Sequence, residues 1–269
     1  DLGGYSIVES MTHSENILIF CGVLLTSTLG CLISFQLPIF LNGLNKEDLT
    51  QYLKGTVYGI AGLLPVLMVC GFLLKIDHFL VSFLPVIGIC AILIGLFFLS
   101  FHTLIVVLTW FSRLVQIAGY IFFFLVCLTF FFGMGFTEES LIDEALRIVF
   151  QMSVIVCGSL VFCEIILRKF SSQIEKIGGF LQIDKYSVMG MVLSFGTSIA
   201  MLPLFEKMNT KGKILNAAFA LSGAFVFGGQ LGFIAGVYPE SVTWFIVVKL
   251  VSGMAGLLVA SICEKHKVV

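Results

Sequence analysis

The sequence predicts an all-α membrane protein, a single transmembrane domain over residues 1–269 folded as a polytopic bundle of about eight membrane-crossing helices. Hydrophobic residues make up 59% of the 269 residues and charged residues only 12%, and the mean hydropathy is +1.10. So little polar surface cannot coat a globule in water, and long apolar runs recur along the chain.

Three apolar runs come first, each long enough to cross about 30 Å of hydrocarbon and each carrying a proline: 17–41, 56–74 and 79–101. Residues 103–113 are apolar but short, and they end in Trp-Phe-Ser-Arg. That pattern is typical of a helix lying at the membrane surface. Five further runs complete the count of eight: 114–132, 148–167, 187–205, 214–237 and 242–262.

The connections differ in charge. Residues 137–147 are acidic, whereas residues 168–186 are rich in Lys and Arg and predict a surface helix. Basic loops favour the cytoplasmic side. Residues 206–213 are also basic, although one predicted crossing separates them from 168–186. The Lys and Arg bias therefore assigns no orientation to the chain.

Two phrases in the chain resemble each other: GCLISFQLPIFLNGLNKEDL from Gly30 and GTSIAMLPLFEKMNTKGKIL from Gly196. Each contains a glycine, an apolar stretch, a Leu-Pro-(Ile/Leu)-Phe word and a charged turn. Five predicted crossings separate them, so we expect them to run in opposite directions. This pattern predicts an inverted-repeat transporter with broken helices, its repeats lying within about 17–101 and 114–262. The alternative is a chance match among many Leu, Ile and Phe residues.

Polar residues in and beside these phrases are the candidate substrate site, because broken helices free backbone groups near the membrane midplane. The polar residues are Gln36, Thr197, Ser198, Asn216 and Gln230, and Pro38 belongs to the site as the residue that breaks the first helix. Their side chains could bind a hydroxyl or an amine. For any one of them, a bond between helices or to the backbone is the alternative.

Two charged residues fall inside predicted crossings. Lys249 could pair with a carboxylate, replace a coupling cation, or extend its ammonium to the membrane surface. Glu164 stands four residues before Arg168, which fits an ion pair within one helix. The alternative is a carboxylate that couples transport to the movement of an ion.

Several function classes lack a signature. The eight cysteines and four histidines show no metal-ligand spacing, and the chain contains no P-loop, HExxH motif or nucleophile elbow. The net charge of −1 and the lack of a basic tract argue against a nucleic-acid partner. We therefore predict no enzyme activity, no cofactor and no metal.

The phrase MNTKGKILNAAFALSGAFVFGGQLGFIAGVYPE, followed by VVKLVSG, resembles the ethanolamine-utilisation permease family, as do DLGGY and the first proline word. The resemblance covers nearly the whole chain. It implies a multi-pass protein of the bacterial inner membrane that takes up ethanolamine as a protonated amine. Family members are longer at the N-terminus, so we expect further spans before Asp1.

The chain also departs from the family pattern. Gly229 and Gln230 stand where the family tends to carry Asp-His, and Ala200 replaces the proline of the second broken helix. If the resemblance holds, Phe225 adds an aromatic face for the ammonium, and the partners are ethanolamine and the lipid bilayer, with a homo-oligomer left open. The alternatives are a carrier for another small solute, such as an amino acid or nucleoside, and a membrane sensor that transports nothing.

Overall fold

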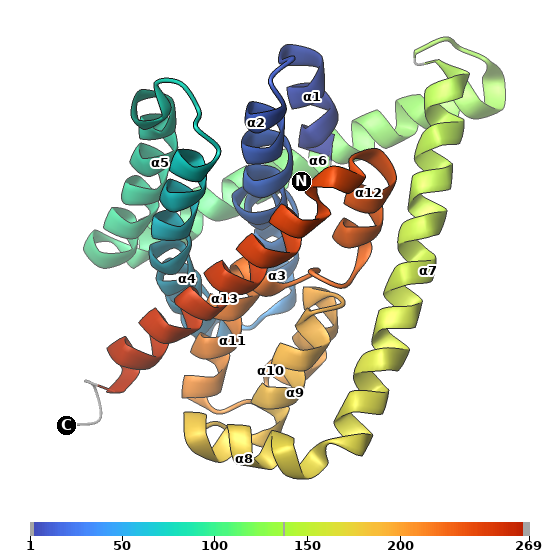
Figure 1. Ribbon diagram of the computed structural model, residues 1–269. Coiled ribbons are helices and arrows are strands. Elements are labelled where there is room, and N and C mark those ends of the chain that lie inside the picture. Colours follow the sequence, from blue (N-terminus) through green and yellow to red (C-terminus); the bar gives the residue numbers. More distant parts are fainter. Residues whose placement is uncertain (1–2, 137, 266–269) are drawn as a thin grey trace.

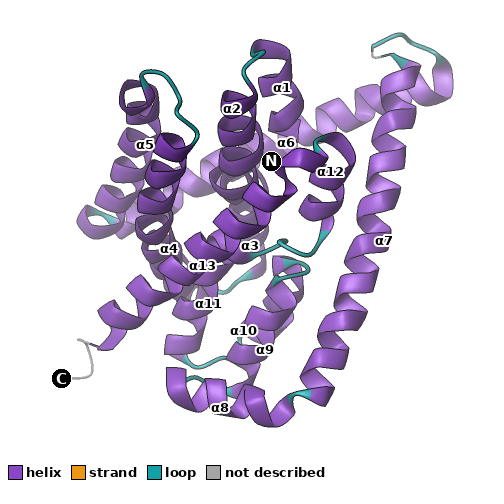
Figure 2. Ribbon diagram, viewed as in Figure 1, coloured by secondary structure: helices purple, strands orange, loops and turns teal. Residues whose placement is uncertain are grey.

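Helices form the architecture throughout the described part of the chain, with no strand in it (Figures 1 and 2). The computed structural model describes residues 3–136 and 138–265. Of the eight cysteines and four histidines of the sequence, the side chains of Cys163 and His266 lie outside the described residues. Five helices within the described ranges are long and apolar enough to cross a membrane, which confirms a helical membrane protein. The finer count of eight crossings stays a prediction.

The first candidate membrane span is a rod that runs from Glu15 to Gly43, after the short helix α1 (Gly3–Met11). Its segments are α2 (Glu15–Ile17), the π-helical η1 (Leu18–Gly30) and η2 (Leu32–Gln36), and α3 (Leu37–Gly43). Hydroxyl groups inside the rod bond to carbonyls one turn earlier; Thr28, for example, donates to Leu24 at 2.6 Å. Pro38 follows η2 and has no N–H to donate, so the helix changes its winding there.

The next elements are long helices: α4 (Lys46–Leu73), α5 (Phe79–Leu99), α6 (Phe101–Phe132) and α7 (Glu139–Lys169). The prediction of a separate surface helix at 103–113 is wrong, because these residues and 114–132 form the single helix α6. Neither Gly nor Pro occurs before Gly119 in α6, so nothing in the sequence breaks it. The helix predicted after α7 is present as α8 (Ser171–Leu181), and its place at the membrane surface stays a prediction.

The predicted crossing at 187–205 is wrong as well. This stretch consists of α9 (Lys185–Ser194), the 3₁₀ turn η3 (Ser198–Met201) and the short α10 (Leu202–Phe205), and it returns to the end of the molecule from which it started. Asp184, which caps α9, accepts a hydrogen bond of 2.7 Å from the backbone N–H of Asn209, which caps α11 (Thr210–Gly223). Burial disfavours the charged carboxylate, but this bond and those from Ser187 and Tyr186 outweigh it and lower the pKa of Asp184.

The return of this hairpin removes the conflict between the two basic loops, since 168–186 and 206–213 lie at the same end of the molecule. It also changes the relation between the two proline words. Phe40 and Phe205, which close the words, make an edge contact with ring centroids 6.2 Å apart. Both words run toward that one end, where Asp48 of α4 forms an ion pair with Lys213 of α11. The two phrases therefore run in the same direction, contrary to the opposite directions expected.

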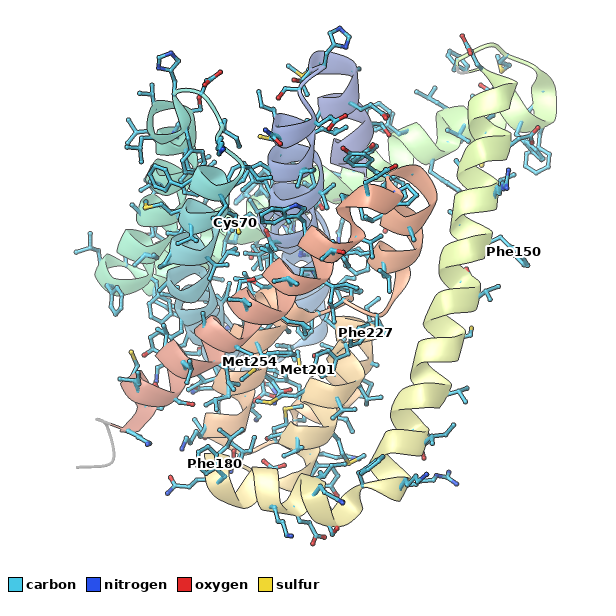
Figure 3. All side chains as sticks on the ribbon, viewed as in Figure 1. Cys70, Phe150, Phe180, Met201, Phe227 and Met254 are labelled. Atoms are coloured by element: carbon cyan, nitrogen blue, oxygen red, sulfur yellow. The ribbon has the colours of Figure 1, made fainter. Side chains whose placement is uncertain are left out.

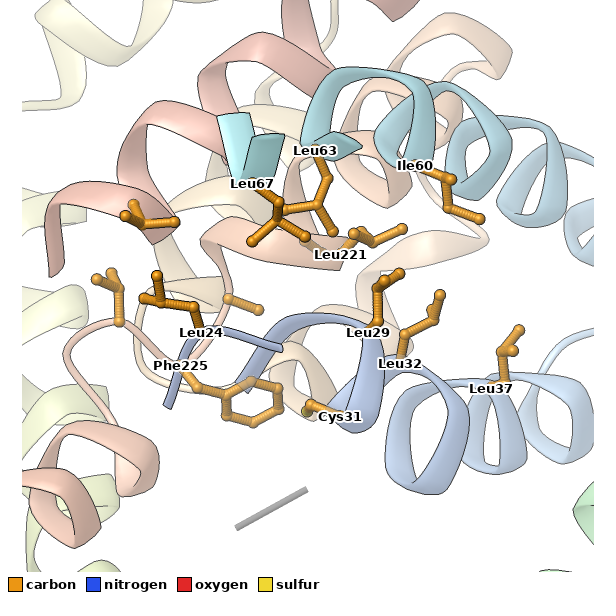
Figure 4. Packing of buried hydrophobic residues seen from close by; sticks show 14 of the residues in the cluster. Leu24, Leu29, Cys31, Leu32, Leu37, Ile60, Leu63, Leu67, Leu221 and Phe225 are labelled. Atoms are coloured by element: carbon orange, nitrogen blue, oxygen red, sulfur yellow. The ribbon is translucent and has the colours of Figure 1, made fainter. Parts of the chain in front are cut away.

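The core of the bundle is formed by α4, α11 and α13 (Val242–Lys265), which cross at close range. A Cβ added at Gly55 would lie 2.3 Å from the Ile214 carbonyl oxygen, and one at Gly62 would lie 2.3 Å from the Gly256 nitrogen. Only glycine allows these backbones to approach so closely. Leucines of the rod and of α4, such as Leu29 and Leu63, fill the space beside them (Figure 4).

The run predicted as one membrane-spanning helix at 214–237 is interrupted. Residues 214–237 form two helices, α11 and α12 (Gly229–Val237), with an unwound segment between Gly223 and Gly229. A short turn, η4 (Pro239–Ser241), then leads into α13. In Figure 1 the body of the molecule gathers around α11 and α13, whereas α7 stands along one side, where it contacts α9 and α12.

Candidate functional site

Two helix interruptions meet in the interior, and we call the pair of unwound segments, 195–197 and 224–228, the crossing. The N–H of Phe225 donates to the Ser194 carbonyl and the N–H of Phe227 donates to the Phe195 carbonyl, both at 2.9 Å. These bonds join the segments much as neighbouring strands are joined. Two backbone hydrogen bonds therefore fix the position of one unwound segment against the other.

The sequence explains why both helices stop here. The helix α11 ends at Gly223, because Ala224 has an extended backbone with ψ of 154° and Phe225 a left-handed one with φ of +63°. A Cβ added at Gly228 would lie 1.8 Å from the carbonyl oxygen of Gly196, so only glycine fits between the segments. On the opposite side, the hydroxyl of Thr197 accepts from the N–H of Ile199 at 3.3 Å and caps the 3₁₀ turn.

The rod reaches the crossing through Gln36 and Phe35. The Gln36 side chain is 2% exposed, and its Nε2 donates to the Ala220 carbonyl at 3.0 Å, one turn before the break in α11. Phe35 makes an edge contact with Phe225, with 5.8 Å between the ring centroids. Pro38 is buried two residues further along the rod. Gln36, Thr197 and Phe225 thus lie in or beside the crossing, and their part in a substrate site stays a prediction.

A buried ammonium lies beside the crossing. Lys249 is 1% exposed, and its Nζ donates to the Ser27 carbonyl at 2.9 Å and to Gln230 Oε1 at 2.8 Å. The ring of Phe245 lies 5.4 Å from the same nitrogen, within the range of a cation–π contact. No carboxylate of the described residues forms an ion pair with it. The expectation of a surface-seeking side chain is therefore wrong, because a carbonyl, an amide and a ring hold the ammonium inside.

Two buried hydroxyls flank the crossing without a hydrogen-bond partner among the described residues. Ser198 follows the first unwound segment closely, and Ser222 precedes the second by two residues. A buried hydroxyl without a hydrogen bond lowers the stability of the fold by about 1–3 kcal/mol, and a ligand that bonds to it would recover this free energy. The sequence singled out Ser198 but missed Ser222, although its position in the glycine-rich segment was a usable signal. It also missed Ser27, which acts through its backbone carbonyl and so leaves no side-chain signature.

Two predicted site residues lie elsewhere. Asn216 ties α11 to α9: its Nδ2 donates to the Ser187 carbonyl at 2.8 Å and to the Gly212 carbonyl at 2.9 Å. Its Oδ1 is buried without a partner in the described structure, but it faces Gly190 rather than the crossing. Glu164 lies exposed on α7 and accepts a 2.8 Å bond from Arg168, so the helical ion pair is the role that the structure shows.

Comparison with known proteins identifies relatives over the whole described fold. The family described as "Ethanolamine utilisation protein, EutH" matches residues 1–263. The chain is 28% identical to a probable ethanolamine permease EutH of Listeria monocytogenes over 263 residues, covering 96% of this chain and 70% of that protein. It is 23% identical to the probable ethanolamine permease EutH of Salmonella typhimurium over 97% of this chain and 70% of the relative.

A third relative, the uncharacterized protein YxeR of Bacillus subtilis, is 25% identical over 97% of this chain and 71% of its own length. No solved structure matches the chain. Since one family description accounts for nearly every residue, the chain belongs to the EutH family of ethanolamine utilisation proteins.

Proposed function

We propose that this protein is a permease that carries protonated ethanolamine across the bacterial inner membrane, in which it is a multi-pass protein. Relatives named as probable ethanolamine permeases support the substrate. The interrupted helices support transport, because transporters place their sites where broken helices expose backbone groups inside the membrane. The proposed role is movement of the solute without chemical change.

The observation that carries this proposal is the environment of Lys249. The crossing region already holds a primary ammonium through a carbonyl oxygen, an amide oxygen and a phenyl ring. The ammonium of ethanolamine has the same charge and the same three N–H donors. We infer that the substrate exchanges with Lys249 for these acceptors, so that the lysine keeps the site occupied between transport cycles.

The hydroxyl of ethanolamine also has candidate partners. The hydroxyls of Ser198 and Ser222 are buried beside the crossing and make no hydrogen bond in the described structure. The Gln36 amide and the Phe225 ring complete the proposed site, with Thr197 and Pro38 holding the backbone around it. In this arrangement the acceptors of Lys249 bind the ammonium end of ethanolamine, and the two serine hydroxyls bind its hydroxyl end.

The charge distribution supports an orientation. Several lysines lie at the end of the molecule where α9 and α11 begin and α13 ends, which we call the lysine-rich end: Lys46, Lys176, Lys185, Lys207, Lys211, Lys213 and Lys265. Positively charged residues gather on the cytoplasmic side of membrane proteins. We therefore propose that the lysine-rich end faces the cytoplasm.

The test is uptake of labelled ethanolamine at mildly acid pH by cells that express the full-length protein. Under these conditions the amine is almost fully protonated and crosses lipid poorly on its own. We expect saturable uptake that unlabelled ethanolamine blocks and that choline, serine and uridine do not. Absence of saturable uptake in cells with normal amounts of the protein in the membrane would refute the proposal.

One observation favours a second candidate, a carrier for a zwitterionic solute such as an amino acid. The charge of Lys249 lacks a carboxylate partner in the described structure, and a substrate carboxylate could supply one. The family resemblance implies ionisable residues at the positions of Gly229 and Gln230, and their replacement is compatible with such a change of substrate. Inhibition by serine in the same assay would select this candidate.

A further inference from the structure

An apolar groove opens at the lysine-rich end and reaches as far as Phe195 of the crossing. It has a volume of about 710 Å³ and lies between α8, α9, α11 and α13. Apolar side chains line its length, among them Phe219, Leu257 and Leu258. Figure 3 shows Phe180 on α8 and Met254 on α13, two further residues of its lining. We propose that this groove binds one anionic phospholipid.

The charges at the mouth of the groove argue for an anionic headgroup. Lys176, Lys211 and Lys265 come from three different helices and line the same groove. None of the three forms an ion pair with a described carboxylate, and Lys211 makes only a 3.3 Å hydrogen bond to Gln182. The nearby Glu264 is already bonded to Lys54 at 2.6 Å. Three uncompensated ammonium groups are therefore available to a phosphate.

The length of the groove argues for a lipid tail. On α13 the lining runs from Met254 to Lys265, which is eleven residue steps, or about 16 Å at 1.5 Å per residue. One leaflet contributes about 15 Å of hydrocarbon, half of the total thickness. The apolar part of the groove thus spans one leaflet, with its lysines at the depth of the headgroups.

The helix α8 adds a further argument, because it is short and lies at the same end of the bundle. Its Phe180 is 89% exposed and lines the groove beside Lys176 on the same helix. An exposed phenyl ring near a lysine is typical of helices that sit at the boundary between headgroups and acyl chains. Phe180 can then cover an acyl chain while Lys176 contacts the phosphate.

The test uses the full-length protein purified in mild detergent and measures bound lipid by native mass spectrometry. The probes are dioleoylphosphatidylglycerol and dioleoylphosphatidylcholine, which share their acyl chains and differ in headgroup charge, with glycerol 3-phosphate as the headgroup alone. We expect the anionic lipid to bind at least tenfold more tightly than the neutral one, and glycerol 3-phosphate not to displace it.

The variants separate a built groove from general surface charge. The triple change Lys176→Gln, Lys211→Gln and Lys265→Gln should weaken binding of the anionic lipid roughly a hundredfold, at about fivefold per lysine. The matched control changes three exposed lysines of the same end that do not line the groove: Lys46→Gln, Lys185→Gln and Lys207→Gln. This control should change the affinity less than threefold.

A second pair of variants tests the acyl-chain part of the groove. Leu258→Trp fills the groove and should remove both lipids, whereas Val251→Trp places the same ring on an exposed position of α13 outside the groove. Equal affinity for the two lipids, equal losses in both lysine triples, or displacement by glycerol 3-phosphate would each overturn the proposal. So would a dimer or another segment of the full-length protein that covers the groove and excludes lipid.

Discussion

Replacing Gln230 by leucine should destabilise the protein more than replacing Lys249 itself. The Gln230 Oε1 accepts one of the two hydrogen bonds of the buried ammonium, at 2.8 Å. In Gln230→Leu the charge stays buried with only the Ser27 carbonyl and the Phe245 ring to stabilise it. A hydrogen bond to a charged group contributes about 1.5–3 kcal/mol, so we expect a loss of about 2–3 kcal/mol in the free energy of unfolding.

Lys249→Met removes the two hydrogen bonds together with the cost of burying a charge, which is several kcal/mol. The two effects oppose each other, so we expect a change within about 1 kcal/mol of zero. The double variant has no buried charge left to satisfy and should recover most of the loss caused by Gln230→Leu. Both single variants should nevertheless lose uptake, because the proposed exchange of ammonium groups needs both residues.

The assay is denaturant-induced unfolding of the purified protein in detergent micelles, followed by intrinsic fluorescence. Gln36→Leu is the matched control, because it makes the same change at a buried amide that donates to a neutral carbonyl. It should cost only about 0.5–1.5 kcal/mol. If Gln230→Leu costs no more than this control, or if the double variant is less stable than both single ones, the described bonding of Lys249 is refuted.

Three further predictions follow from other contacts. Gly228→Ala should lower the melting temperature and abolish uptake, because its Cβ would meet the Gly196 carbonyl at 1.8 Å, whereas Gly95→Ala, with nothing within 4 Å, should do neither. Asp184 has a lowered pKa in the folded protein, so its stabilising effect is complete above the ordinary Asp pKa of about 3.9. The effect is lost as the pH falls through the lower pKa of the folded protein. Asp184→Asn should therefore lower the melting temperature at pH 7 and make the melting temperature fall less on acidification. Gln36→Ala should raise the KM for ethanolamine, whereas Asn216→Ala should reduce stability and leave KM unchanged; an effect of Asn216→Ala on KM would place the site at α9 rather than at the crossing.

The sequence predicted the fold class and most helices because apolar length alone decides which segments can cross a membrane. It could not distinguish a membrane-spanning helix from a hairpin at 187–205, because a broken segment that turns back has the same composition as one that continues across the membrane. The hydrogen bond from Asn209 to Asp184 decides between them, and it joins residues that no local pattern relates. The predicted direction of the second proline word was wrong for the same reason.

The candidate site was predictable where the sequence marked backbone interruption with proline, glycine or a lone polar residue. Gln36 and Gln230 were found in this way, and both are buried beside the crossing or the ammonium. The partners of Lys249 were not predictable, since one is the backbone carbonyl of Ser27, far away in the chain. A contact of that kind depends on how the helices pack and not on any residue type.

The most direct test of the account is the KM for ethanolamine uptake in Ser222→Ala and Ser198→Ala. Neither hydroxyl has a hydrogen-bond partner in the described structure, so its removal breaks no hydrogen bond within the protein. If these groups bind the substrate hydroxyl, each change should raise KM about threefold to tenfold, the equivalent of one hydrogen bond, and should leave inhibition by ethylamine unchanged. Ser252→Ala, which removes a hydroxyl bonded to the Val248 carbonyl, is the control and should not alter KM. An unchanged KM in both Ser222→Ala and Ser198→Ala would contradict the placement of ethanolamine at the crossing.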